Sequence, residues 1–105
     1  MRRGEVYRFR VPKGLGHEQQ GERFGVIVQA DELLPRSVVL VAPTSRSARA
    51  ASFRPEVVVA GDDTRVLVEQ LGAVDVQRLG KRVGRLGAED MWAIDEALMT
   101  VLGLD

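Results

Sequence analysis

Apolar and polar side chains alternate along residues 5–11 of the sequence, EVYRFRV. Tyr7, Phe9 and Val11 fall on one face of an extended chain, and the two arginines between them fall on the other face. This period of two predicts a strand with one buried face and one face in solvent. The first predicted element is therefore a half-buried strand.

β-branched residues dominate the next two apolar runs, Phe24–Ala30 and Ser37–Ala42. Neither run alternates, so both are expected to form strands that are buried on both faces. Three shorter strands are expected at Glu56–Ala60, Arg65–Gln70 and Arg82–Leu86, with a turn at residues 61–64 and a short helical turn at Val76–Leu79.

The period changes to that of a helix near the C-terminal end of the sequence. Acidic residues Glu89 and Asp90 suit the positive end of a helix dipole, and Gly103 is a typical helix stop. Trp92 and Met99 make the apolar face wider than one side of a thin sheet needs, which favours a subunit contact and predicts a homodimer. Spacings of three and four place the remaining apolar residues on one face: Met91, Ile94, Leu98, Val101 and Leu102.

About six short strands followed by one helix indicate an α+β, mostly β protein. Contiguous antiparallel strands with short turns favour a small, strongly curved sheet or barrel with the helix packed on it. The 105 residues are 45% hydrophobic, which is enough to build the core of a single domain over residues 1–105.

The composition makes several classes of protein poor candidates. The chain has no cysteine, which excludes disulfides and thiolate metal ligands and is typical of a reducing cytoplasm. It has no 18-residue apolar run and no secretory h-region, so we expect no membrane association. A single histidine and scattered carboxylates match no zinc pattern, and there is no P-loop. We therefore expect neither a metal nor a cofactor.

The net charge is zero, but the charges are unevenly distributed. Four arginines and no acid lie between Leu33 and Pro55, whereas residues 88–105 contain five acids and no basic residue. Such asymmetry can mark an anion-binding face. The alternative interpretation is a solvated surface without a ligand.

Two predicted connections, residues 12–22 and 43–55, are long for a compact domain, and such loops are usually functional or disordered. The first contains the only histidine, His17, which can transfer a proton near neutral pH, and it leads to Arg23. If both loops lie at one edge of the sheet, they form a cationic groove. The second loop offers hydroxyl and guanidinium groups that suit phosphate oxygens: Thr44, Ser45, Arg46, Ser47, Arg49 and Arg54.

Several segments together resemble the MazF/PemK toxin family of type II toxin–antitoxin systems, and its Kid-like PemK branch in particular. The most specific segment is the glycine-flanked GHEQQGER at residues 16–23. It is accompanied by RRGEVY (2–7), VVLVAPTS (38–45), EQLGAVDVQRLGKRVGRL (69–86) and IDEALMTVLGL (94–104). The resemblance covers nearly the whole chain.

The resemblance implies an SH3-like barrel, a homodimer, and inhibition by a cognate antitoxin. It also implies a metal-independent endoribonuclease that cuts single-stranded RNA by attack of a 2′-hydroxyl on the adjacent phosphorus. The products of that reaction are a cyclic phosphate and a free 5′-hydroxyl. The reaction needs a base, an acid, and cations around the phosphorane.

The resemblance also implies roles for individual residues. Arg23 matches the family's loop arginine and would stabilise the phosphorane, and Thr44 would bond a phosphate oxygen. His17 and Glu69 both remain candidates for the base, although Glu69 alternatively pairs with an arginine on the sheet. Further RNA contacts are expected from Gln19, Gln20, Ser45, Arg46, Ser47, Arg49 and Gln70.

Two positions depart from the family pattern. Phe24 stands where a proline normally follows the loop arginine, which removes a restraint on the backbone beside Arg23. Leu67 stands where the PemK branch has an arginine two residues before its acid. We expect compensation for that arginine from Arg46, Arg49 or Arg65.

Two other functions remain open from the sequence. One is a non-catalytic protein that binds RNA or antitoxin, which the substitutions at positions 24 and 67 would allow. The other is a gyrase-inhibiting toxin on the same fold, which the GHEQQGER segment argues against.

Overall fold

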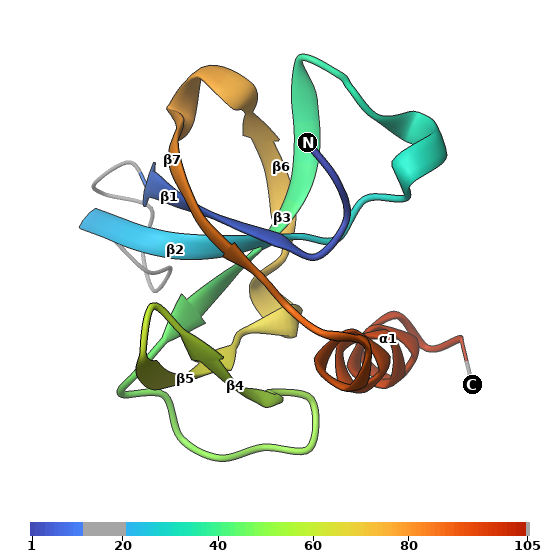
Figure 1. The fold of residues 1–105 in the computed structure, drawn as a ribbon. Helices are drawn as coiled ribbons and strands as arrows, with labels where there is room; N and C mark the ends of the chain where they lie inside the picture. Colours follow the sequence, from blue (N-terminus) through green and yellow to red (C-terminus); the bar gives the residue numbers. More distant parts are fainter. Residues whose placement is uncertain (12–20, 105) are drawn as a thin grey trace.

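The computed structural model of the chain describes residues 1–11 and 21–104. In these ranges seven strands form one antiparallel sheet, and a single α-helix follows them (Figure 1). The α-helix, α1, spans Ala88–Leu102. The strands are β1 (Glu5–Val11), β2 (Gly21–Ile27), β3 (Val38–Ser45), β4 (Glu56–Val59), β5 (Asp62–Val66), β6 (Gly72–Asp75) and β7 (Leu79–Arg85).

The sheet curls because β3 is long and pairs with three different strands. Val38–Val41 pair with β6, residues 41–43 pair with β2, and Thr44–Ser45 pair with β5. The strand order is β4-β5-β3-β2-β1-β7, with β6 paired on β3 outside this path. The mostly β prediction, a curved antiparallel sheet with a C-terminal helix, is confirmed.

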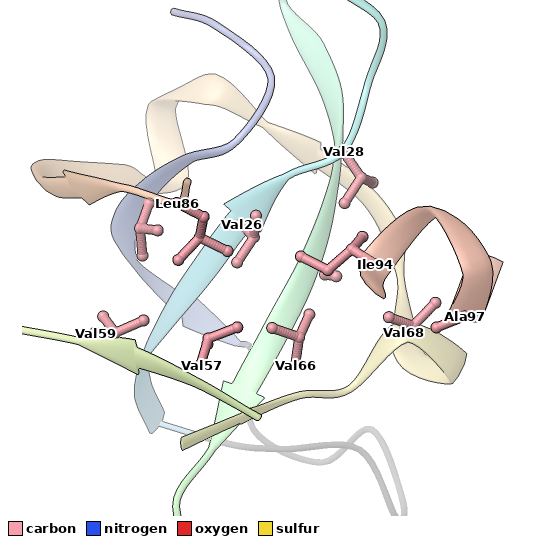
Figure 2. Packing of buried hydrophobic residues seen from close by; sticks show 11 residues of the cluster. Val26, Val28, Val57, Val59, Val66, Val68, Leu86, Ile94 and Ala97 are labelled. Carbon is pink, nitrogen blue, oxygen red and sulfur yellow. The ribbon is translucent and has the colours of Figure 1, made fainter. Parts of the chain in front are cut away.

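Two apolar clusters lie on opposite faces of the curled sheet. The larger cluster joins the sheet, the β4–β5 hairpin and α1, and Figure 2 shows Ile94 of the helix toward valines of the sheet and Ala97 beside Val68. The smaller cluster contains Phe9, Ile27 and Val41. Strands β2 and β3 contribute to both clusters, and this is why their sequences are rich in β-branched residues.

The helix forms as its sequence predicts. Glu89 and Asp90 occupy its first turn, and Gly103 ends it in the left-handed conformation with φ of 69°. Of the apolar residues predicted on one helical face, Ile94 is completely buried, whereas Leu102 in the last turn is exposed.

Several predicted boundaries were wrong. The expected strand Arg65–Gln70 is instead the end of β5 followed by a 3₁₀ turn at Val68–Gln70. The turn expected at residues 61–64 instead consists of Ala60 and Gly61, which both adopt positive φ between the end of β4 and the start of β5 at Asp62. Strand β6 was missed because its sequence, GAVD, contains two residues that are depleted in strands. In β3, Val38 and Leu40 are exposed, contrary to the expectation of two buried faces.

Gly25 has the least room for a side chain among the described glycines. A Cβ atom at this position would lie 2.5 Å from Val41 Cγ1 and 2.7 Å from Phe9 Cε1. These distances are shorter than a van der Waals contact, so only glycine fits here without movement of β1 or β3. Gly25 therefore fixes how deeply the middle of β2 sits between its neighbours.

No helix in the described ranges is long and apolar enough to cross a membrane.

Candidate functional site

A pocket of 470 Å³ lies where β2 and β3 meet the β4–β5 hairpin. Its lining comes from three parts of the sequence, at residues 23–24, 44–47 and 59–64. The curl of the sheet joins these parts, because the end of β3 pairs with β5. The residues that line the pocket are Arg23, Phe24, Thr44, Ser45, Arg46, Ser47, Val59, Asp62 and Thr64.

Arg23 is held by the backbone ladder of β2, where it lies opposite Phe9 of β1. Its side chain is partly buried. Arg46 is a second guanidinium in the lining, and its Nη1 lies 3.4 Å from the carboxylate of Asp62. Both partners of that pair are well exposed, so the pair is weak and Arg46 can exchange its partner for an anionic ligand.

Three hydroxyl groups lie beside these two cations. Thr44 is buried, and its hydroxyl donates a hydrogen bond to the carbonyl of Phe24 at 3.2 Å. The hydroxyls of Ser45 and Ser47 lie 3.4 Å apart, and the Ser47 backbone N–H donates to Ser45 Oγ. Guanidinium groups together with hydroxyl groups are suited to phosphate oxygens.

Five of the residues predicted from the sequence therefore meet in one pocket: Arg23, Thr44, Ser45, Arg46 and Ser47. Arg49, Glu69 and Gln70 are not among the described residues that line it. His17, Gln19 and Gln20 lie outside the described residues.

Glu69 makes an ion pair with Arg54. Nε and Nη2 of Arg54 both donate to Glu69 Oε2, at 2.8 Å and 2.6 Å, and Arg54 Nη1 donates to the carbonyl of Arg49. This arrangement joins the β3–β4 connection to the 3₁₀ turn that carries Glu69. Glu69 Oε1 is buried without a hydrogen-bond partner in the described part of the chain.

The structure shows the surroundings of the two residues that depart from the family pattern, Leu67 and Phe24. Leu67 is fully buried, and its backbone N–H donates to the carbonyl of Pro43. Phe24 lines the pocket, and Arg8 lies over its ring at 5.5 Å from the centroid.

The arginine that is missing at position 67 was expected to be replaced by another arginine, such as Arg65. This finds no support for Arg65, since Arg65 pairs with Glu56 at 2.7 Å. The guanidinium beside Glu69 belongs to Arg54, which sequence reasoning placed in the loop without this partner.

Sequence reasoning also missed three lining residues, Val59, Asp62 and Thr64. No local pattern identifies them, because they belong to a hairpin that reaches the pocket only through the pairing of β5 with β3.

A second polar cluster lies on β1, outside the pocket lining. Burial raises the pKa of Glu5, but a hydrogen bond from the Arg2 backbone, another from Tyr7 and the charge of Arg82 outweigh it. The net pKa of Glu5 is therefore lower than its ordinary value. The pKa of Tyr7 is raised by burial, and by its hydrogen bond to Glu5 and the charge of that carboxylate.

Within residues 1–11 and 21–104, no three His, Cys, Asp or Glu side chains are grouped so that they could hold a metal ion.

Comparison with known proteins identifies close relatives over the full length of the chain. A toxin candidate of Mycobacterium tuberculosis, Rv3098A, is 40% identical over 104 residues, which cover 97% of each chain. Endoribonuclease MazF9 of the same organism is 31% identical over 117 residues, which cover 99% of this chain and 98% of the relative.

The same fold is present in a solved structure. A mycobacterial endoribonuclease in complex with its cognate antitoxin superposes with a TM-score of 0.81 at 22% identity, covering 100% of this chain and 97% of that one. The family model for the PemK-like, MazF-like toxin of type II toxin-antitoxin systems matches residues 2–102. The chain therefore belongs to the PemK/MazF-like toxin family.

Proposed function

We propose that this toxin is an endoribonuclease that cuts single-stranded RNA in the pocket between β2, β3 and the β4–β5 hairpin. The observation that carries the proposal is the convergence of Arg23 and Arg46 with the hydroxyls of residues 44–47 in that pocket. The relative MazF9, at 31% identity, is named an endoribonuclease, which supports the same activity.

The chemistry that fits the pocket is attack by a 2′-hydroxyl of the RNA. The 2′-oxygen loses its proton to a base and bonds to the adjacent phosphorus, and the bond from phosphorus to the 5′-oxygen breaks. The 5′-oxygen takes up a proton, which leaves a 2′,3′-cyclic phosphate and a 5′-hydroxyl end. The RNA supplies its own nucleophile, so the protein has only to position the strand, move protons and stabilise charge.

Arg23 stabilises the charge that develops on the phosphorane oxygens. Arginine side chains stay charged in proteins, so Arg23 acts as a fixed cation and not as a proton donor. Because it belongs to a paired strand, its position is set before substrate binds. Thr44 contacts the phosphate when its hydroxyl turns away from the Phe24 carbonyl.

His17 is the base that we favour. The other candidate, Glu69, is already engaged by two donors of Arg54 and does not belong to the described pocket lining. Glu69 instead holds the β3–β4 connection in place. Gln19, Gln20, Arg49 and Gln70 remain proposed RNA contacts around the pocket.

The partners follow from the family and its relatives. A cognate antitoxin inhibits the toxin by direct binding, as the solved complex of a similar fold suggests. The protein acts as a homodimer in the cytoplasm, and it uses no metal or cofactor.

The test is to incubate the pure protein with a long RNA in the presence of EDTA and to map the new ends. We expect cleavage within single-stranded regions, giving 5′-hydroxyl and cyclic phosphate ends. Binding without cleavage would indicate a non-catalytic protein. Cleavage that disappears in EDTA and returns with Mg²⁺ would contradict the mechanism.

A further inference from the structure

Thr64 occupies an unusual position in the pocket. It lies on β5 opposite Val57 of β4, on the face of the hairpin that packs into the larger core cluster. The buried residues around it on that face are Val57, Val59 and Val66. Thr64 is thus a polar residue in a layer of valines, at the point where that layer reaches the pocket.

The hydroxyl of Thr64 is unpaired in the part of the chain that the structure describes. The residue is only 6% exposed, and Oγ1 is buried without a hydrogen-bond partner among the described residues. An unpaired buried hydroxyl is unfavourable. Valine has the same shape, would fill the same space and would carry no such penalty. Packing alone therefore does not account for threonine at this position.

The other polar groups of the pocket indicate what the hydroxyl would bind. Two cations, Arg23 and Arg46, lie in the same lining, and the only described acid there, Asp62, faces Arg46. This charge distribution favours an anion with oxygen acceptors. A threonine hydroxyl can donate to such an oxygen, and a change of staggered rotamer about the Cα–Cβ bond turns the hydroxyl to a different direction.

We propose that Thr64 is a substrate-contacting residue whose hydroxyl donates a hydrogen bond to a phosphate oxygen of RNA bound in the pocket. The proposal rests on the endoribonuclease function above. It adds the β4–β5 hairpin to the strands that bind substrate, and it explains an unsatisfied group that destabilises the free protein.

The experiment compares Thr64→Val with Thr64→Ser. The readouts are the melting temperature, KM and kcat for RNA, and the Kd for an oligonucleotide with a 2′-deoxy sugar at the cleavage position. We expect Thr64→Val to raise the melting temperature by about 4 °C, because the unpaired hydroxyl is removed. The same variant should weaken binding of the deoxy analogue about tenfold.

Thr64→Ser keeps the hydroxyl and should bind the analogue within about twofold of the wild type. Thr100→Val, a matched change at an exposed threonine of α1, should alter neither binding nor stability. A Thr64→Val protein with wild-type binding would overturn the proposal, as would one that melts at a lower temperature, since the hydroxyl would then have a structural partner.

Binding of the deoxy analogue does not require cleavage. A wild-type protein that binds RNA but never cuts it would therefore refute the proposed enzyme and leave the Thr64 comparison intact. Conversely, wild-type cleavage with no effect of Thr64→Val would refute only the role of Thr64.

Discussion

Arg23 is the residue whose placement follows most directly from the fold. Its backbone belongs to β2, and its side chain reaches a pocket that residues far away in the sequence complete. A cation held in this way needs no rearrangement during the reaction, and this is the condition under which charge stabilisation is most effective.

Arg23→Ala should therefore reduce RNA cleavage by a factor of about 100 to 1000, which corresponds to roughly 3 kcal/mol or more of transition-state stabilisation. Its melting temperature should stay close to that of the wild type. Arg36→Ala provides the control, because Arg36 is exposed and, among residues 1–11 and 21–104, its side chain donates to the Leu33 carbonyl alone. Cleavage by Arg23→Ala within threefold of the wild type would remove Arg23 from the mechanism.

The pH dependence of kcat should identify the base. If His17 accepts the proton, kcat should rise with pH through a pKa of about 6.5 and level off above it. His17→Gln should abolish this limb of the profile. A pH profile that His17→Gln leaves unchanged, but that Glu69→Gln alters, would instead assign the base to Glu69.

Glu5 should contribute to the pH dependence of stability. Its pKa in the folded state is below the ordinary value of 4.5, so the charged carboxylate stabilises the fold. That contribution is complete above about pH 5 and is lost as the pH falls through the lowered pKa. The difference in melting temperature between wild type and Glu5→Gln should therefore be largest near pH 7 and shrink toward about pH 3. A constant difference over this range would disprove the linkage.

At the scale of elements, the β3–β4 connection is held in place by the Arg54–Glu69 ion pair. Both side chains are about three-quarters buried, at 23% and 24% exposure, so the pair is only weakly screened by solvent. One oxygen of Glu69 has no partner in the described part of the chain. The carboxylate therefore depends on Arg54 for its compensation.

Arg54→Ala should lower the free energy of unfolding by about 2 kcal/mol, because it leaves a largely buried carboxylate unpaired. Adding Glu69→Gln to Arg54→Ala should recover part of this loss, since an amide is less costly to bury than a charge. Urea denaturation of the wild type, both single variants and the double variant measures the coupling. Additive effects of the two changes would show that the pair does not stabilise the fold.

The elements with strong periodicity could be predicted from the sequence. Strand β1 and helix α1 have clear periods of two and 3.6, and local sequence determines both. The break after β5 was not predicted, because the apolar run Val66–Val68 within Arg65–Gln70 has strand-like composition. Tertiary packing of the buried residues Leu67 and Val68 favours a 3₁₀ turn there.

The residues of the candidate site could be predicted only where the local sequence carries a signal. Residues 44–47 could be identified because hydroxyl and guanidinium groups follow one another in a single run. Arg23 could be identified because its loop resembles that of the family. Thr64 and Asp62 carry no local signal, since strand pairing alone brings them to the pocket. The partnership of Arg54 with Glu69 likewise joins residues fifteen positions apart.

At the scale of the whole molecule, α1 leaves an apolar surface uncovered. Ile94 is completely buried and Met91 and Leu98 pack against the core, so these parts of the predicted dimer face are already used within the chain. Trp92 and Met99 are 69% and 43% exposed. Together with Leu102, which is 55% exposed, they form the apolar surface of the helix that remains for a contact between subunits.

The protein should therefore have about twice its monomer mass of 11.5 kDa by light scattering at micromolar concentration. Trp92→Glu should shift it toward the monomer, because a charge at the centre of an apolar contact is costly to bury. Val58→Glu is a matched control, since Val58 is equally apolar and 60% exposed but lies on β4. Equal effects of both changes would place the contact elsewhere or rule it out.

The close approach at Gly25 has a consequence for how this protein can evolve. Gly25 lies two residues from Arg23 on the same face of β2, so any side chain there would force Phe9, Val41 or the strand that positions the guanidinium to move. In a selection for cells that survive expression of the toxin, Gly25 substitutions should appear as often as changes in the pocket itself. Recovery of toxicity should then require a second change that makes room, such as Val41→Ala. Residues 25 and 41 are therefore expected to change together, although neither belongs to the described lining of the pocket.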